Sequence, residues 1–264
     1  MMCGHGCPMI AALNAWSLVA VAAAGAACGL VNTIAGGGSL ILFPVLLLAG
    51  LAPLDANVTN SVSTWAGYVG GVGGFRTEIR AQRRRLPRLV VATILGSATG
   101  CILLLVTPSA AFDVVVPFLV LLATGMTAVQ PYVQRRLKER PSDHPQPGAA
   151  AVISIFLATI YGGYFGGALG VIVLAVLGLT IRDTIRNLTA SKALISLVDA
   201  TVSVIIFGFF GPVHWVYVAV AAPTTLLGGW LGAHVARRMN ERVLRGCVVA
   251  LGLVVSVALF VRLR

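Results

Sequence analysis

The sequence predicts an all-α, polytopic membrane protein, and three observations lead to this fold class. First, 58% of the 264 residues are hydrophobic and only 10% are charged, whereas soluble domains carry about a quarter charged residues. Second, about ten apolar segments follow one another, most of them close to the roughly 20 residues that a helix needs to cross a bilayer. Third, basic residues gather in short clusters between these segments, as in the cytoplasmic loops of membrane proteins. The net charge of +11 therefore indicates topology, and no nucleic-acid partner is expected.

The apolar segments are the expected helices. In chain order they lie at 17–35, 39–51, 57–75, 88–107, 111–133, 149–168, 169–181, 186–210, 213–236 and 243–261. The second and the seventh are short, because thirteen helical residues cover about 20 Å and the hydrocarbon core is about 30 Å thick. They hold matching places in the two halves of the chain, which is the best sequence pointer to the binding site of a transporter. Each of them either spans the bilayer or forms a re-entrant hairpin with the segment before it.

The first 16 residues contain no Lys or Arg, so the sequence does not predict a signal peptide. Cys3, His5 and Cys7 offer metal-binding groups, but a disordered terminus is the interpretation that we favour, and no metal or cofactor is predicted. The other cysteines stand singly in apolar segments, where a thiol behaves as a small hydrophobic group. Lone thiols and the scarcity of intramembrane His and carboxylates argue against an enzyme.

The basic residues give the expected orientation. Sixteen of the nineteen Lys and Arg lie in four alternate connections, at Arg76–Arg88, Arg135–Arg140, Arg182–Arg186 and Arg237–Arg245. The other connections contain none, so every basic loop falls on one face, which the positive-inside rule assigns to the cytoplasm. Both termini are then outside. This orientation places Arg262 and Arg264 on the outer face, against the positive-inside rule.

Glycines and polar residues recur 130 positions later in the chain. The recurring positions are Gly36 and Gly37 with Gly166 and Gly167, Asn57 with Asn187, Thr59 with Thr189, and Ser61 with Ser191. This offset predicts two transmembrane repeats, 17–137 and 149–264, joined by a polar, proline-rich linker at 138–148. Because five segments per repeat is an odd number, the second repeat enters from the opposite side. The repeats are therefore inverted, the arrangement that permits alternating access.

Pairs of glycines four residues apart also recur. Gly96 and Gly100 in the fourth segment match Gly228 and Gly232 in the ninth. Small residues at this spacing let helix backbones approach closely in lipid. Close helix packing is therefore the expected role of these pairs.

The first candidate binding site is the pair of glycine-rich breaks before the two short segments. Consecutive glycines weaken a helix, and a broken helix in a bilayer is tolerated only inside protein or beside a water-filled cavity. A break exposes backbone N–H groups at the start of the following helix, and with the helix dipole these favour an anion. An anion-binding turn and a purely structural kink are both consistent with the pattern. The residues assigned to these breaks are Asn32, Gly36, Gly37, Gly38, Ser39, Gly166 and Gly167.

The second candidate is a polar patch that begins the third and the eighth segments. Its residues are Asn57, Thr59, Asn60 and Ser61 in the first copy, and Asn187, Thr189, Ser191 and Lys192 in the second. Helix capping explains one such residue but not three that recur, so we assign the patch to the substrate. Lys192 either neutralises a bound anion or snorkels to the nearby cytoplasmic surface. Asp199 follows seven residues later on nearly the same helical face, and either couples transport to protons or balances Lys192.

Four stretches together resemble a known family. They are the glycine turn Asn32–Ser39, the patch Asn57–Ser61, the segment Tyr161–Gly167 and the ending Pro223–Arg237. In this order they resemble the TauE/SafE sulfite exporter family, also called TSUP, over residues 17–261. The resemblance implies a secondary transporter that moves small sulfur-containing anions, such as sulfite, sulfonates or sulfoacetate, across the bacterial inner membrane. A passive anion channel is the alternative. The expected partners are the anion and the lipid bilayer, and a homo-oligomer is left open.

Overall fold

The protein is all-α in the computed structural model, which describes residues 15–34, 36–136, 147–181, 183–235 and 241–262. Within these ranges the regular elements are helices and no strand occurs. Five of the helices are long and apolar enough to cross a membrane. The predicted polytopic, all-α class is therefore confirmed. The elements are α1 (Ala15–Ile34), α2 (Ser39–Leu48), α3 (Pro53–Val72), η1 (Gly73–Phe75), α4 (Arg76–Ala81), α5 (Leu86–Val106), α6 (Ser109–Arg136), α7 (Ala149–Tyr164), α8 (Leu169–Thr180), α9 (Ile185–Phe210), α10 (Trp215–Val235) and α11 (Glu241–Arg262).

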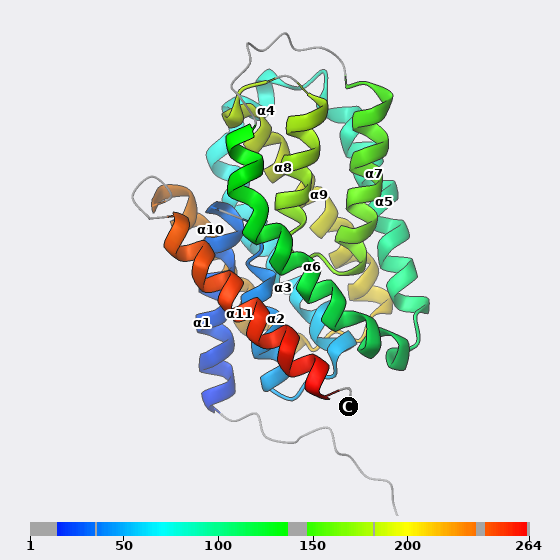
Figure 1. The fold of residues 1–264 in the computed structure, drawn as a ribbon, viewed down its shortest axis with the longest axis vertical. Coiled ribbons are helices and arrows are strands. Elements are labelled where there is room, and N and C mark those ends of the chain that lie inside the picture. The colour runs from blue at the N-terminus through cyan, green and yellow to red at the C-terminus, as the bar shows by residue number, and fades with distance from the viewer. Residues whose placement is uncertain (1–14, 35, 137–146, 182, 236–240, 263–264) are drawn as a thin grey trace, which may run out of the picture.

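Two helical hairpins enter the molecule from opposite ends (Figure 1). In that view α1 rises from the lower end to the middle and α2 returns to the lower end, whereas α7 descends from the upper end and α8 returns to it. Both turns need backbone conformations that suit glycine: φ is 79° at Gly36, 96° at Gly37 and 74° at Gly166. Ala168 also has a positive φ, of 58°, directly before α8. The predicted helix breaks are thus confirmed, and each short helix returns toward the end of the molecule from which its hairpin enters.

Helix contacts follow the same pattern in both halves of the chain. α1 packs on α10 and α7 packs on α5; α3 contacts both α10 and α9, and α9 contacts α5. The outer helices α6 and α11 pack on each other, α6 also touches α8, and α11 also touches α2. Each of the pairings named here has its counterpart if the first five apolar helices are exchanged for the last five, in order.

The recurring glycines lie at two of these helix crossings. A Cβ on Gly228 would collide with the carbonyl oxygen of Ala26 in α1, and a Cβ on Gly96 would collide with that of Phe156 in α7. Ala26 and Phe156 are themselves 130 positions apart. The predicted packing role of these glycines is therefore confirmed at both crossings.

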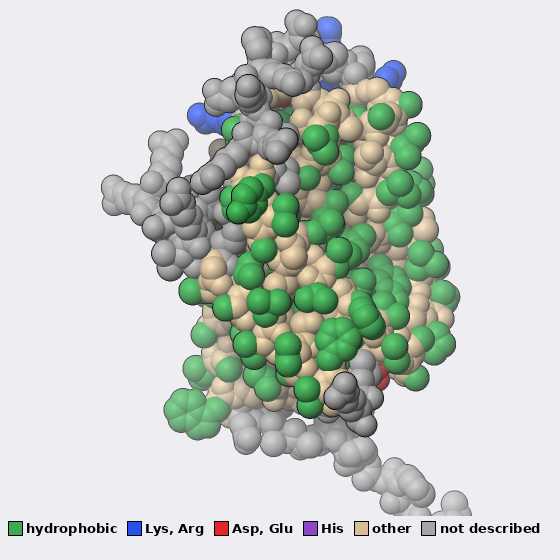
Figure 2. Space-filling view, viewed as in Figure 1, with side chains coloured by type: hydrophobic (Ala, Val, Ile, Leu, Met, Phe, Trp, Pro, Cys, Tyr) green, Lys and Arg blue, Asp and Glu red, His purple; other side chains and the backbone are tan. Residues whose placement is uncertain are grey.

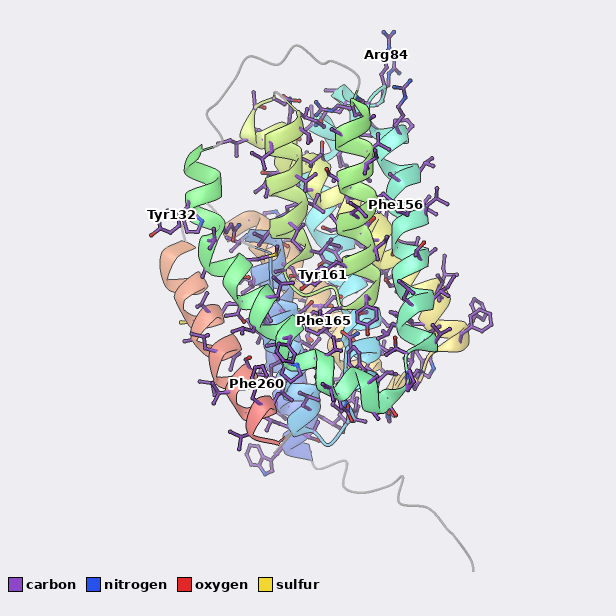
Figure 3. The ribbon with its side chains drawn as sticks, turned by 45° about the vertical axis from the view of Figure 1, so that its right-hand side comes forward. Arg84, Tyr132, Phe156, Tyr161, Phe165 and Phe260 are labelled. Carbon is purple, nitrogen blue, oxygen red and sulfur yellow. The ribbon has the colours of Figure 1, made fainter. Side chains whose placement is uncertain are left out.

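The surface agrees with a protein that is embedded in a membrane. Hydrophobic side chains are spread over the whole flank seen in Figure 2, and the Lys and Arg side chains visible in that view lie at its upper end. Arg84 marks this end in Figure 3. The basic connections that the structure describes between α3 and α5 and between α8 and α9 lie at the same end (Figure 1).

The starts of α3 and α9 differ from the predicted boundaries. α3 begins at Pro53, after Ala52, and α9 begins at Ile185, where the hydroxyl of Thr184 accepts a hydrogen bond from the Asn187 N–H. Proline at the first position favours a helix start because its missing N–H would have no partner there. The polar patches therefore lie inside the helices, and Thr184 rather than a residue of the second patch caps α9.

Candidate functional site

The two hairpin tips meet in the middle of the molecule. A Cβ placed on Gly170, in the first turn of α8, would lie 3.6 Å from the α carbon of Gly36. A second contact joins the hairpins through aromatic rings, because Phe43 of α2 packs edge-on against Phe165, with ring centroids 5.7 Å apart. Tyr161 and Phe165 lie at this level, near the centre of Figure 3. The tips of two separate hairpins thus form one junction.

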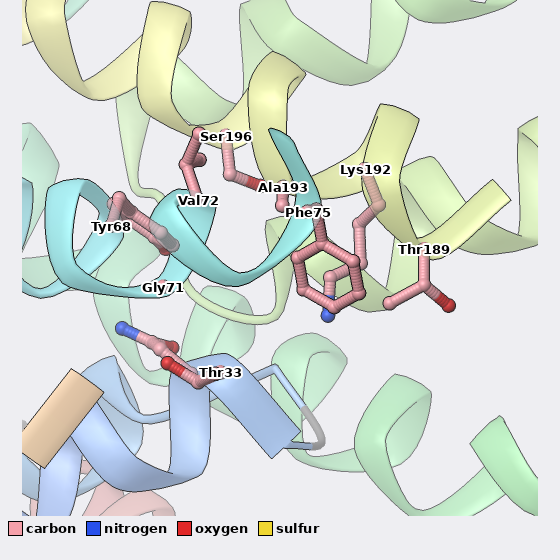
Figure 4. Close-up of a pocket in the computed structure, with 10 residues that line it drawn as sticks. Thr33, Tyr68, Gly71, Val72, Phe75, Thr189, Lys192, Ala193 and Ser196 are labelled. Atoms are coloured by element: carbon pink, nitrogen blue, oxygen red, sulfur yellow. The ribbon is translucent and has the colours of Figure 1, made fainter. Parts of the chain in front are cut away.

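A pocket opens beside this junction, and we call it the lysine pocket (Figure 4). Its empty volume is about 320 Å³, which includes the open space at its mouth. Its main polar lining residues are Asn32, Thr33, Tyr68, Thr189, Lys192 and Ser196. These residues come from α1, α3 and α9, and three of them, Asn32, Thr189 and Lys192, are predicted site residues.

Lys192 is the charged group of this pocket. Its side chain descends from α9 beside Phe75 in Figure 4, and only 5% of the residue is exposed. A snorkelling lysine would place its amine in water, whereas this residue is buried. Among the residues whose exposure the structure describes, Arg85 is the other buried basic residue, and it is paired with Asp183. The cationic group that reaches the junction is therefore Lys192.

A second pocket, the aspartate pocket, shares Tyr68 with the first. Its other polar lining residues are Ser39, Ser61, Thr64, Asp199 and Ser203. Gly162 and Gly166, at the end of α7, also line it. Ser39, Ser61, Gly166 and Asp199 were predicted as site residues. Seven predicted residues are therefore divided between two neighbouring pockets, one with a cationic and one with an acidic side chain.

Two asparagines of the predicted set hold the helix breaks. Asn32 Oδ1 accepts a hydrogen bond of 2.7 Å from the Gly38 N–H, directly before α2. Asn57 Nδ2 donates to the carbonyl oxygen of Tyr164, the last residue of α7, over 3.0 Å. Each side chain satisfies a backbone group that the broken helix leaves without an intrahelical partner. Part of the polarity at the breaks is therefore structural.

Two residues of the second polar patch, Asn187 and Ser191, belong to a network at the upper end. Ser191 donates to Gln82 Oε1 over 2.7 Å, and Gln82 Nε2 donates to the Asn187 carbonyl over 3.1 Å. Asn187 Nδ2 donates to Asp183 Oδ1 over 2.7 Å, and Asp183 Oδ2 lies 2.7 Å from Nη1 of Arg85. This buried network connects the start of α9 to the segment between α4 and α5. Ser191 and Asn187 therefore lie outside the linings of the two pockets.

Burial by itself would raise the pKa of Asp183. Hydrogen bonds from Asn187, the Thr184 N–H and Arg85, together with the Arg85 charge, instead lower the pKa of this carboxyl below its ordinary value. Asp183 is consequently ionised at neutral pH and balances Arg85.

The residues of the first polar patch do not gather at one site either. Thr59 is fully buried near the lower end, where its hydroxyl accepts a hydrogen bond of 3.1 Å from the His214 N–H. His214 Nε2 lies 3.2 Å from Oδ2 of Asp55 in the same region. Asn60 is buried as well, and its Oδ1 has no hydrogen-bond partner. The remaining predicted residues lie in or beside the turns at Gly37, Gly38 and Gly167.

The structure adds lining residues that the sequence did not single out. Tyr68 lines both pockets, and Thr33 and Ser196 line the lysine pocket. Ser196 lies four residues after Lys192 and Tyr68 lies seven after Ser61, so both share a helix face with a predicted residue. This periodicity is the signal that would have found them. Among the described residues, no group of three or more His, Cys, Asp and Glu side chains is placed to hold a metal ion.

Comparisons with known proteins identify a family and several relatives that the chain resembles. The sequence model of the family described as "Sulfite exporter TauE/SafE" matches residues 21–259. A probable membrane transporter protein of Haemophilus influenzae is 24% identical over 229 residues, which cover 86% of this chain and 88% of that protein. The probable membrane transporter protein YfcA of Escherichia coli K12 is 24% identical over 238 residues, covering 88% and 85% of the two chains. No solved structure matches the chain significantly.

Proposed function

Because the chain belongs to the sulfite exporter TauE/SafE family of membrane transporters, we propose that it is a secondary transporter of small sulfur-containing anions. Sulfite and sulfonates are the substrates that the family description favours. We place the protein in the bacterial inner membrane, with its basic connections in the cytoplasm and both termini outside.

The observation that carries the substrate class is the position of Lys192. Its side chain is buried in the lysine pocket, and its Cδ and Cε carbons lie 3.6 Å from the position of a Cβ on Gly170. An anion that leaves water for this pocket loses hydration, and helix dipoles supply only about half a charge at each helix end. A fixed ammonium group supplies the remaining compensation. Thr189 and Ser196 line the same pocket and offer hydroxyl groups to anion oxygens.

The backbone breaks contribute less to anion binding than isolated helix starts would. The Gly38 N–H is taken by Asn32 Oδ1, and the Leu40 N–H donates to the Gly37 carbonyl. Glycine at both tips lets the two hairpins touch beside the side chain of Lys192. In the proposed mechanism Lys192 therefore supplies the charge, and the glycines bring the two hairpins together next to it.

Alternating access is supported by the arrangement of the two hairpins. They enter from opposite ends, and their tips touch at Gly36 and Gly170. Inverted repeats around a central site are the framework with which many secondary transporters expose one site to either side in turn. We propose that residues 17–137 and 149–264 are such repeats and that the junction is the site that they share.

Uptake into proteoliposomes tests the function directly. Purified protein is reconstituted and offered sulfite, sulfate, taurine or sulfoacetate, with and without a pH gradient. Saturable uptake of at least one sulfur-containing anion, with accumulation against its gradient, is the expected result. Flux that only follows the anion gradient would favour a passive channel, and equal flux in protein-free liposomes would contradict both functions.

A further inference from the structure

The aspartate pocket is lined by oxygen atoms from several helices. Ser39 comes from α2, Ser61 from α3, and Asp199 and Ser203 from α9. A pocket with this lining offers a carboxylate and several hydroxyl oxygens to one ligand. Oxygen ligands of this kind suit hard cations.

The buried carboxylate of Asp199 is only partly hydrogen-bonded, and the Ser97 side chain is one of its partners. Only 4% of the residue is exposed, and its Oδ1 atom has no hydrogen-bond partner. The Oδ1 atom lies 2.7 Å from the position that a Cβ on Gly162 would occupy, so it points at the end of α7, where Gly162 lines the pocket. Burying an ionised carboxylate without compensation costs several kcal/mol, so this site requires a positive charge.

The end of α7 adds a second source of negative potential. Gly162 is one of the last residues of α7, and Gly166 lies in the break that follows; both line the aspartate pocket. The terminal carbonyls of a helix lack intrahelical partners and carry the negative end of its dipole. Ends of half-helices and unwound carbonyls coordinate Na⁺ or protons in other transporters.

The charged and titratable groups around Asp199 do not neutralise it. Tyr68 of α3 and Cys101 of α5 are close enough to interact with its charge, and both side-chain types are ordinarily uncharged at neutral pH. α7 presents Gly162 to the carboxylate. On α9 itself Lys192 is seven residues away, about 10 Å along the helix axis, and it lines the lysine pocket instead.

From these observations we propose that the aspartate pocket binds a small monovalent cation, Na⁺ or a proton, whose binding is coupled to anion movement through the lysine pocket. The proposal rests on the transporter function above. Tyr68 lines both pockets, so occupation of one pocket is expected to act on the other through this ring.

The test separates cation binding from anion binding. Detergent-purified protein is heated in NaCl or in choline chloride at the same ionic strength and pH, and again with sulfite added. In proteoliposomes, anion accumulation is measured under a Na⁺ gradient at equal pH and under a pH gradient at equal Na⁺. The variants are Asp199→Asn, which removes the charge and keeps the shape, Ser203→Ala, and the control Asp113→Asn on α6, a carboxylate outside the pocket lining.

In the wild type, one of the two gradients should raise accumulation at least tenfold. Asp199→Asn should lose this effect and keep both anion exchange and the thermal shift by sulfite, while Asp113→Asn should behave as the wild type. Ser203→Ala should raise the half-saturating cation concentration without abolishing accumulation. A thermal shift by NaCl that Asp199→Asn lacks assigns Na⁺, and a response to the pH gradient alone assigns the proton.

Gradient-driven accumulation by Asp199→Asn at the wild-type level would overturn the proposal. Wild-type protein that responds to neither gradient, although sulfite shifts its unfolding, would overturn it as well. Absence of any anion response in the wild type would instead contradict the proposed function, so the two failures are distinguishable.

Discussion

Gly36 and Gly170 touch across the centre of the molecule, with the α carbon of Gly36 lying 3.6 Å from the position of a Cβ on Gly170. Gly36 belongs to the break between α1 and α2, and Gly170 lies in the first turn of α8. The side-chain carbons of Lys192 lie at the same distance from that Cβ position. The junction therefore accepts one additional carbon at Gly170 in ordinary contact, and a branched side chain would displace Lys192 or the turn.

Substitution of Gly170 tests the junction without straining the backbone. Gly170→Ala should fold and transport as the wild type, because its Cβ fits and alanine favours a helix over glycine by about 1 kcal/mol. Gly170→Leu should reduce anion uptake at least tenfold, because its side chain fills space beside Lys192. Uptake and size-exclusion profiles are measured together, with Gly125→Leu as the control, since a Cβ on Gly125 meets nothing within 4 Å. Normal uptake by Gly170→Leu would show that the junction plays no part in transport.

Lys192→Gln removes the charge of the lysine pocket and keeps a polar side chain of similar length. The half-saturating anion concentration should rise at least tenfold, which corresponds to about 1.4 kcal/mol. Lys192→Arg should retain more affinity because it keeps the charge. Transport kinetics measure both, with the exposed Arg88→Gln as a control for lost positive charge. An unchanged half-saturation in Lys192→Gln would exclude this lysine as an anion ligand.

The pair of Arg85 and Asp183 should stabilise the upper end far more than a surface pair. Arg85→Gln leaves Asp183 charged and buried, and should lower the unfolding free energy by about 3 kcal/mol. Arg186 also pairs with an acid, Glu78, but its side chain is 67% exposed, so Arg186→Gln should cost less than about 1 kcal/mol. Thermal unfolding at neutral pH compares the two variants. Equal losses would mean that burial does not strengthen the Arg85 pair.

The same pair predicts a pH dependence. Because the folded state lowers the pKa of Asp183, its stabilisation is complete above the ordinary carboxyl pKa of about 3.9 and is lost as the pH falls through the lowered value. The difference in unfolding temperature between the wild type and Arg85→Gln should therefore be constant near neutrality and shrink in acid. A difference that grows in acid would contradict the ionised pair.

Glycines at the helix crossings should tolerate no side chain. Gly228→Ala and Gly96→Ala place a methyl group against the backbone carbonyls of Ala26 and Phe156. Each should destabilise the protein by about 1–3 kcal/mol, as overpacking of a close contact does. Thermal unfolding is the measurement, and Gly125→Ala, which enters open space, should be neutral or stabilising. Similar effects at the two crossings are expected if the halves of the chain are equivalent.

Cysteine labelling tests the inverted arrangement of the repeats. Ala52 and Arg186 are exposed next to the starts of α3 and α9. In a background without the native cysteines, Ala52→Cys should react with an impermeant thiol reagent from outside intact cells, and Arg186→Cys only after the membrane is opened. Labelling of both from the same side would contradict the inversion.

Local sequence determined where helices form and where they break. Long apolar runs specify membrane helices because every backbone polar group must be satisfied within the segment. The breaks at Gly36–Gly38 and Gly166–Gly167 were also predictable, since positive φ angles suit glycine. The glycine pairs of α5 and α10 predicted close crossings, although their partners on α7 and α1 could not be read from the spacing.

Only the tertiary structure decided which polar residues share a pocket. Asn57 and Lys192 belong to the two polar patches that were assigned to one substrate, yet Asn57 bonds the Tyr164 carbonyl and Lys192 enters the lysine pocket. Tyr68 lines both pockets because it lies on α3, which contacts the pocket-lining helices α1, α2 and α9. Hydropathy and periodicity are properties of a single segment, and they determine whether the segment forms a helix and which of its faces is apolar. The partner of each buried polar group, in contrast, depends on how helices distant in sequence cross, and those crossings arise from packing across the whole molecule.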